Sequence, residues 1–206
     1  MKAIKRDNKE EATISKSSSA KLSFLKSGLL AAILLIFALV AFSATASAAV
    51  INVPADYPMI QQAIYNVTAE NRTIEVNATA YNAQGTPETV DVTKSDIIIR
   101  SVNGRAVIDA DGADDHVFNV TDQTNVTLKG FEIRDARGTS QDVAGIYMHN
   151  ASECNISNNI MTNISATGTY AAIGIRLYVS NNNTFSSSTT ISNINRLSNN
   201  YQTINR

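Results

Sequence analysis

The sequence predicts an all-β protein whose chain winds as a parallel solenoid, and two observations support this fold class. An apolar phrase recurs with steps of 29 residues at 117–120, 146–149 and 175–178, and a second phrase follows it in the same order from residue 126 onwards. The segments are short, rich in Val, Ile and Thr, and bounded by Asn, Asp, Gly and Ser, which is typical of strands and tight turns. Repeats of this length bury their apolar face only by stacking on their neighbours, so they indicate a solenoid.

The repeat predicts which side chains lie above one another, because equivalent positions of stacked coils point the same way. Two inward columns are expected, one of Val117, Ile146 and Ile175 and one of Val126, Ile156 and Phe185. Phe131 and Ile160 share the same offset. Asn125, Asn155 and Asn183 are expected at turns, where an asparagine tolerates left-handed backbone and its amide bonds the neighbouring coil.

Residues 1–48 have the composition of a targeting segment. Seven Lys/Arg lie within residues 1–26, an uncharged apolar run covers 28–42, and small residues surround Ala48. This order predicts a secretory signal peptide that is cleaved after Ala48. The alternative is an uncleaved signal anchor, because the apolar segment is nearly long enough to span a bilayer. In both cases we expect export to the cell surface, the extracellular space or a periplasm, with membrane contact only through this segment.

Residues 49–206 are expected to form one β-helix domain, since about 158 residues can bury a single core. They contain ten Lys/Arg and fifteen Asp/Glu, a net charge of −5. Because no basic stripe remains, nucleic acid is not expected as a partner. Cys154 is the one cysteine of the sequence, so no intramolecular disulfide is expected.

The first elements of this domain depart from the strand pattern once. Residues 50–53 predict a strand, and residues 54–67 predict an amphipathic helix with Asp56 at its N-cap and Pro58 in its first turn. Such a helix is expected to cover the open end of the first coil, which otherwise exposes apolar residues and strand edges. Four short strands are then expected at 73–76, 89–92, 96–100 and 106–109.

The last part of the chain has a weaker pattern. Beyond Phe185 the periodicity fades. The domain is therefore expected to be incomplete at its C-terminal end, and its last strand edge is a candidate for self-association.

Three segments carry recurring motifs: 52–64 (N-V-P-A-D-Y-P-M-I-Q-Q-A-I), 125–133 (N-V-T-L-K-G-F-E-I) and 145–147 (G-I-Y). They resemble the opening and the later coils of parallel β-helix repeat proteins of the pectin-lyase-like fold. The likeness covers residues 51–195 and implies a right-handed β-helix with an N-terminal capping helix. One departure is Thr79-Ala80-Tyr81, where the family often has Gly-Thr-Tyr.

Aromatic and polar side chains lead to the first functional hypothesis. Tyr147, Tyr170, Arg176 and Tyr178 are expected on one lateral face, and sugar recognition commonly combines aromatic rings with Asn and Asp. We therefore expect an exported surface module, structural or carbohydrate-binding, without catalysis of its own. Its partner would be a cell-surface glycan or another surface protein.

Charged residues near one coil end lead to an alternative, a calcium-dependent polysaccharide lyase or hydrolase. The resemblance implies enzymes in which carboxylates hold calcium and an arginine removes a proton beside the sugar carboxylate, so Arg134, Asp135 and Asp142 are the candidate catalytic residues. The candidate calcium ligands are Asp109, Asp111, Asp114 and Asp115. The other interpretation is a solvated turn for the aspartates and exposed Arg–Asp pairing for the first group.

A third hypothesis is a periplasmic metal-delivery accessory protein. His116, His149 and Cys154 offer copper ligands, and the resemblance includes copper-binding-type repeat proteins that mature nitrous oxide reductase. Their spacing is not that of a compact metal site. A buried Cys154 with surface histidines is the competing expectation.

Nine N-x-S/T triplets follow residue 48, at Asn66, Asn71, Asn77, Asn119, Asn125, Asn150, Asn155, Asn163 and Asn182. In an exported chain they predict N-glycosylation, foremost at the first three. The alternative is that a solenoid rich in Asn turns and Thr strands produces the triplet by composition.

Overall fold

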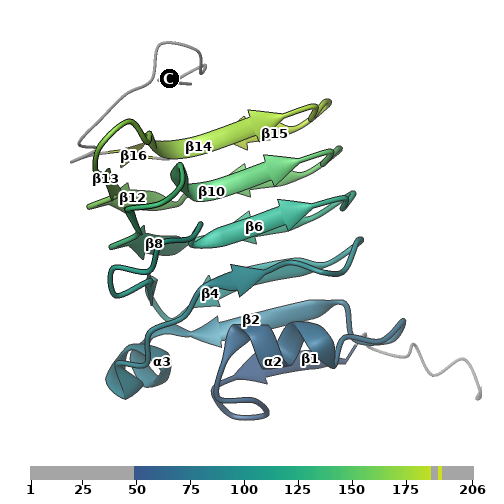
Figure 1. Ribbon diagram of the computed structural model, residues 1–206. Helices are drawn as coiled ribbons and strands as arrows, with labels where there is room; N and C mark the ends of the chain where they lie inside the picture. The colour runs from purple at the N-terminus through teal and green to yellow at the C-terminus, as the bar shows by residue number, and fades with distance from the viewer. Residues whose placement is uncertain (1–48, 187–189, 192–206) are drawn as a thin grey trace, which may run out of the picture. The chain divides into compact units, whose positions relative to one another are not determined.

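The computed structural model describes residues 49–186 and 190–191. In them the chain forms an all-β parallel solenoid of about four turns (Figure 1). The predicted targeting segment lies outside the described residues, as does most of the chain beyond Ser186. Within the described part, none of the helices has both the length and the apolar character to cross a membrane.

Three long sheets and one short sheet run along the stack, and all their pairings are parallel. The first sheet has the order β1 (Val50–Val53), β2 (Thr73–Asn77), β4 (Ile98–Val102), β7 (Thr127–Lys129), β11 (Asn155–Ser157) and β15 (Thr184–Ser186). The second has the order β14 (Ala172–Tyr178), β10 (Val143–His149), β6 (Phe118–Thr121) and β3 (Val90–Asp91). The third has the order β16 (Thr190–Ile191), β12 (Ile160–Thr162), β8 (Phe131–Arg134) and β5 (Ala106–Asp109). The short sheet pairs β13 (Ser165–Ala166) with β9 (Arg137–Gly138).

Inward-facing side chains of the three long sheets meet in one core. The register of the first sheet stacks Ile51, Ile74, Ile99, Leu128, Ile156 and Phe185 in one column. Strands such as β6 alternate buried with half-buried residues, as the two-residue period of a strand requires. The core is therefore a set of columns along the stack, as the sequence period predicts.

One predicted column has its register shifted by one residue. Phe118, not Val117, pairs with Ile146, which in turn pairs with Ile175. Val117 and Phe118 are both fully buried, so the apolar pattern alone could not separate them. The same error affects Phe131 in the third sheet, because the partner of Ile160 is Glu132.

The second predicted column has its register shifted by two residues. Leu128, not Val126, pairs with Ile156. A shift of two leaves the same side chains facing inward, because strand side chains alternate with a period of two. Val126 is accordingly buried as expected, one inward position earlier.

Corners of the solenoid hold residues with left-handed backbone. Asp96, Asn125, Glu153 and Asn182, spaced by 28 or 29 residues, have φ values of 56°, 54°, 58° and 55°. Asn125 is thus a turn residue as predicted, and its amide donates to Asp96 Oδ1 at 3.1 Å. Asn155 was wrongly placed, since it begins strand β11. Asn183 accepts a bond from Cys154 N at 2.9 Å and so contacts the neighbouring coil.

Two helices lie in the first coils, at the start of the stack (Figure 1). Helix α2 covers Ile60–Tyr65 and is shorter than the predicted 54–67. Asp56 is not its N-cap, because its Oδ2 accepts from Asn52 N at 2.7 Å. Helix α3 covers Ala78–Gln84 and was not predicted. It lies between β2 and β3, where the later coils carry a strand of the third sheet.

Each of these helices bonds the edge of a strand through a side-chain amide. Gln61 Oε1 accepts from Asp91 N at 2.6 Å and its Nε2 donates to Asp91 O at 3.1 Å, at strand β3. Asn82 Oδ1 accepts from Val107 N at 2.8 Å and its Nδ2 donates to Arg105 O at 3.1 Å, at strand β5. The amides thus make the pair of bonds that a further strand would make.

Candidate functional site

The outer face of the second sheet carries a row of aromatic side chains. Strands β10 and β14 pair so that Tyr147 lies beside Arg176 and His149 beside Tyr178. Ring centroids are 4.3 Å apart for His116 and Tyr147, 6.2 Å for Tyr147 and His149, and 5.2 Å for His149 and Tyr178. We name these five residues the aromatic face. It includes Tyr147, Arg176 and Tyr178, which the sequence predicts to share a lateral face.

Arg176 is held against this face by an aspartate. Its guanidinium carbon lies 5.6 Å from the centroid of the Tyr147 ring, within cation–π distance. Its Nη1 donates to Asp142 Oδ2 at 3.0 Å, and Asp142 Oδ1 accepts from Ala171 N at 2.7 Å. Asp142, a candidate catalytic residue from the sequence, therefore supports the aromatic face.

His116 has a defined protonation state at one ring nitrogen. Ala144 N donates to His116 Nδ1 at 2.9 Å. An accepting nitrogen carries no proton, so the imidazole is neutral and its Nε2 is the donor. Burial lowers the pKa of His116, although nearby Asp115 opposes the shift. The neutral ring lies flat against Tyr147, with 23° between the planes.

The same outward columns become polar in the preceding coils. Asp91 pairs with Asn119, which pairs with Tyr147, and Thr121 pairs with His149. A pocket of about 290 Å³ lies here, lined by Asp91, Val92, Thr93, Asn119, Thr121 and Gln123. Asn119 Nδ2 donates to Asp91 Oδ1 at 3.0 Å, and Thr121 Oγ1 donates to Asn119 Oδ1 at 2.7 Å. Rings and hydrogen-bonding groups thus lie on one face.

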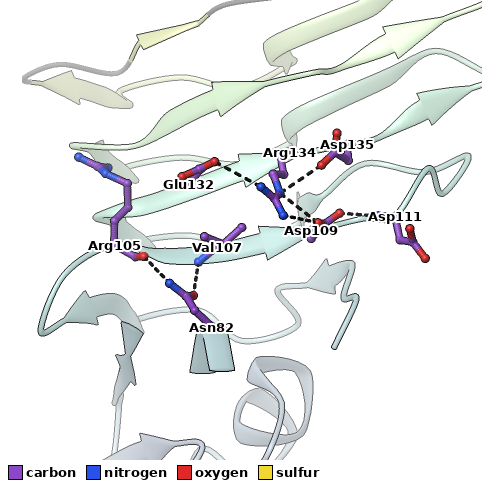
Figure 2. A network of polar contacts seen from close by, with 8 residues as sticks. All are labelled: Asn82, Arg105, Val107, Asp109, Asp111, Glu132, Arg134 and Asp135. Atoms are coloured by element: carbon purple, nitrogen blue, oxygen red, sulfur yellow. Dashed lines mark hydrogen bonds and ion pairs between the residues drawn. The ribbon is translucent and has the colours of Figure 1, made fainter. Parts of the chain in front are cut away.

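The third sheet carries a different outward arrangement, a cluster of charges around Arg134 (Figure 2). Arg134 Nη2 lies 2.8 Å from Asp109 Oδ2, and its Nε lies 3.1 Å from Asp135 Oδ2. Its Nη1 lies 3.8 Å from Glu132 Oε1. The hydrogen bond with Asp109 raises the pKa of Arg134. A general base must give up its proton first, so this environment disfavours Arg134 as a base.

A pocket of about 430 Å³ adjoins the charged cluster, between helix α3 and the third sheet. Its lining consists of Tyr81, Asn82, Gly85, Thr86, Pro87, Val107, Asp109, Asp111 and Arg134. Asp109 Oδ1 accepts from Asp111 N at 2.8 Å, so that carboxylate bonds both the turn and Arg134.

The other two candidate calcium ligands bond different loops. Asp114 accepts from Thr139 N, Thr139 Oγ1 and Ser140 N at 2.7 to 3.0 Å, and these hydrogen bonds lower its pKa to about 2. Asp115 Oδ1 accepts from His116 N at 2.7 Å. Among residues 49–186 and 190–191, no three His, Cys, Asp or Glu side chains form a group that could hold a metal ion.

The candidate copper ligands lie in two environments. Cys154 is 1% exposed and belongs to the core, where burial raises the pKa of its thiol. His116 and His149 lie on the outer face, and Tyr147 stacks with both of them. Cys154 thus has the buried position that the competing expectation gave it.

Glu88 is a buried carboxylate whose role the sequence pattern does not predict. Its carboxylate is 4% exposed and accepts from Ile60 N at 3.2 Å, from Gln61 N at 2.6 Å and from the Tyr81 hydroxyl at 2.5 Å. Burial raises the pKa of Glu88. The carboxylate ties the start of α2 to α3, and its bond to Gln61 spans 27 residues of sequence, so no local motif reports such a contact.

The foremost candidate glycosylation sites already make local bonds. Asn66 Nδ2 donates to Gln62 O at 2.8 Å, Asn71 Oδ1 accepts from Thr68 N at 2.5 Å, and Asn77 Oδ1 accepts from Ala80 N at 3.4 Å as the N-cap of α3. Asn66 is exposed, whereas Asn71 and Asn77 are half-buried. Tyr170 lies in a turn before β14, not on that strand.

No protein family, no curated protein and no solved structure matches the chain.

Proposed function

We propose that the protein is an exported surface module that binds carbohydrate on the aromatic face and has no catalysis of its own. The observation that carries the proposal is the change along the outward columns of the second sheet, from Asn119 and Thr121 to the stacked rings of Tyr147 and His149. A sugar presents C–H surfaces beside hydroxyl groups. It therefore needs flat apolar side chains next to hydrogen-bond donors and acceptors.

The shape of the face favours an extended ligand. Equivalent side chains of successive strands lie about 4.8 Å apart along the stack. The polar pocket and the rings together span β3, β6, β10 and β14. A glycan chain running along the solenoid axis would contact both, whereas a single sugar would contact one.

Two features support the non-catalytic part of the proposal. Arg134 is surrounded by carboxylates that hold it as a cation, which is unfavourable for a lyase base. Three of the four candidate calcium ligands, Asp109, Asp114 and Asp115, already use their carboxylates as acceptors in separate hydrogen bonds.

A glycan array tests the proposal, run on the purified protein with and without calcium. We expect binding that does not need calcium. Tyr147→Ala should weaken it about 30-fold, the loss expected for a central contact worth about 2 kcal/mol. Tyr65→Ala is the matched control, because Tyr65 is 61% exposed on α2 and away from this face. Uniform absence of glycan binding would leave a purely structural module. Turnover of a uronic polymer that Asp135→Ala abolishes would contradict the non-catalytic assignment.

The same proposal includes the finer form of the fold, a right-handed β-helix whose N-terminal end is closed by α2 and α3. Its support is the pair of amides, Gln61 and Asn82, that bond the edges of β3 and β5. Gln61→Ala and Asn82→Ala should each lower the free energy of unfolding by about 1 kcal/mol. Gln62→Ala, at an exposed neighbouring position, should leave it unchanged in urea titrations. Equal stability of all three variants would contradict the closing role.

A further inference from the structure

The corner between the first and third sheets contains a hollow that the proposed function does not use. It has a volume of about 340 Å³ and is lined by Ser101, Gly104, Arg105, Lys129, Gly130 and Asn158. Two of these residues are cations and none is a carboxylate. Residues 49–206 carry a net charge of −5, so a pocket lined only by positive and neutral groups is unusual in this chain.

The hollow exists because one corner is longer than those stacked on it. Arg100 pairs with Lys129, and Ala106 pairs with Phe131. Between these paired positions lie five residues, 101–105, in the first coil and Gly130 alone in the next coil. Gly130 has φ +85°, and a Cβ at this position would lie 3.5 Å from Ser101 Cβ. The missing side chain thus keeps the corner open.

Arg105 extends from this longer corner across two coils. Its Nη1 donates to Phe131 O at 3.2 Å and to Asn158 O at 2.5 Å, and its Nη2 donates to Asn158 Oδ1 at 3.0 Å. In Figure 2 its side chain points away from the Arg134 cluster. Its partners are neutral oxygens, whereas four other arginines of the described residues (Arg72, Arg100, Arg134 and Arg176) form ion pairs with carboxylates.

The hydrogen bonds of Arg105 fix the position of its guanidinium group and leave some of its N–H donors available. A guanidinium has five N–H donors, and these contacts use three. The remaining two are Nε–H and one Nη2–H. Arg134 binds the Asp109 carboxylate through the same two nitrogens. This edge is therefore suited to an oxyanion, which it binds with two parallel bonds.

Lys129 supplies a second charge at the same hollow. Its side chain is exposed on β7, in the outward column that also contains Arg100. Two like charges that line one pocket repel each other, and an anion between them reverses the sign of that interaction. We propose that this corner binds an oxyanion group, a carboxylate, sulfate or phosphate, between the guanidinium of Arg105 and the ammonium of Lys129.

The experiment is a titration of the full protein with sodium phosphate, sodium sulfate and sodium glucuronate, each against sodium chloride at equal ionic strength. Binding is followed by calorimetry and by the rise in melting temperature. A free inorganic anion and the carboxylate of an acidic sugar are the two sources, and the tighter of these probes identifies which one the site takes. No effect beyond that of chloride, for all three probes, would overturn the proposal.

Two variants locate the binding. Lys129→Ala should weaken it about fivefold, the effect of losing one exposed charge partner, without loss of folding. Lys94→Ala, at another exposed lysine, is the matched control and should bind as the unchanged protein does. Arg105→Gln should abolish binding, with folding checked by circular dichroism because Arg105 bridges two coils. Equal affinity in Lys129→Ala and Lys94→Ala would overturn the site, whatever Arg105→Gln does.

Discussion

The aromatic face and the charged cluster occupy outward positions on two sheets of one solenoid. They differ in how far their side chains are already bonded to partners within the protein. In the cluster, three carboxylates lie within 4 Å of Arg134, so its positive charge is neutralised by ion pairs within the protein. On the aromatic face the rings stack on one another, and Tyr178 remains 56% exposed. The same strand spacing therefore produces one surface that satisfies itself and one that can still receive a ligand.

A cluster of charges is therefore a poor indication of a ligand site unless the ion-pair partners of its members are known. Exposed ion pairs form wherever opposite charges share a column, and they contribute little to stability. The outermost ring is not paired in this way, because Tyr178 remains 56% exposed and its face and hydroxyl are open to solvent. Substitutions that change one surface and leave the other intact test whether the two surfaces differ in this way.

The largest effect is expected from Gly145→Val, which acts on the strand beneath the aromatic face. A Cβ at Gly145 would lie 2.8 Å from Met161 Cγ and 2.9 Å from Gly174 O. Overpacking of this kind should lower the free energy of unfolding by about 3 kcal/mol, measured in urea. Gly168→Ala is the control, because a Cβ there meets nothing within 4 Å and only its φ of +65° opposes the change. A Gly145→Val protein as stable as Gly168→Ala would show that β10 can move outward.

Glu88→Ala should have a smaller effect on stability. It acts beside the pocket next to helix α3, which Tyr81 lines. It removes the acceptor of two backbone N–H groups of α2 and of the Tyr81 hydroxyl. Leaving buried donors without a partner should lower the free energy of unfolding by about 2 kcal/mol. Glu70→Ala, at an exposed position, should not change the melting temperature. Unaltered glycan binding by Glu88→Ala would support the separation of the two surfaces, whereas its loss would contradict it.

Arg134→Met should cost about 1 kcal/mol or less, because the ion pairs are partly exposed and solvent screens them. The change leaves Asp109, Glu132 and Asp135 without their shared cation. Glycan affinity should stay within twofold of the unchanged protein on the array. A loss of binding as large as that of Tyr147→Ala would mean that the charged cluster belongs to the site.

The smallest effect is a pH dependence that arises at His116. Burial depresses its pKa in the folded protein, so the neutral imidazole favours folding. That contribution is fully present above the ordinary histidine pKa of about 6.5 and is lost as the pH falls through the lower folded value. Asp115, Asp142, Asp91 and Arg176 are the charges that act on this ring. His116→Asn keeps an acceptor for Ala144 N without a titrating ring.

The unfolding free energy of the unchanged protein should therefore fall more than that of His116→Asn between pH 7.5 and 5. Parallel curves for the two proteins would show that another group is responsible. His116→Ala, which also removes the acceptor, should be less stable than His116→Asn at every pH.

The period of apolar residues was enough to predict the parallel stack, but not its register. Columns are defined by which residues face inward, and Val117 and Phe118 are both buried at one bend. The apolar pattern does not report which of the two residues pairs with Ile146, and only the contact between the coils shows that it is Phe118. Helix α3 could have been found, because Asn77 and Gly85 are the cap residues expected at its two ends.

For the site, residue type and period brought Tyr147, Arg176 and Tyr178 to one face correctly, because all three lie in the repeated phrase. The sequence offers His116 and His149 only as copper ligands, because the residue type indicates metal binding and the register that stacks both rings on Tyr147 is not visible in it. Asp142 was grouped with Arg134 by proximity in sequence, although its partner Arg176 lies 34 residues further on. Which residue pairs with Asp142 depends on a contact between two coils, and spacing along the sequence does not show it.

The side-chain amides of Gln61 and Asn82 make hydrogen bonds to the edges of β3 and β5, and these hydrogen bonds restrict how the solenoid could be lengthened. A strand edge whose polar groups are already bonded to side chains offers no template for another chain, so the starting edges of the second and third sheets are protected from pairing with a second molecule. Duplicated coils would have to enter as whole repeats, for example between β7 and β11, where parallel pairing continues the sheet on both sides. An engineered protein of this kind would have a longer face for an extended ligand and would keep helices α2 and α3 at the start of the solenoid.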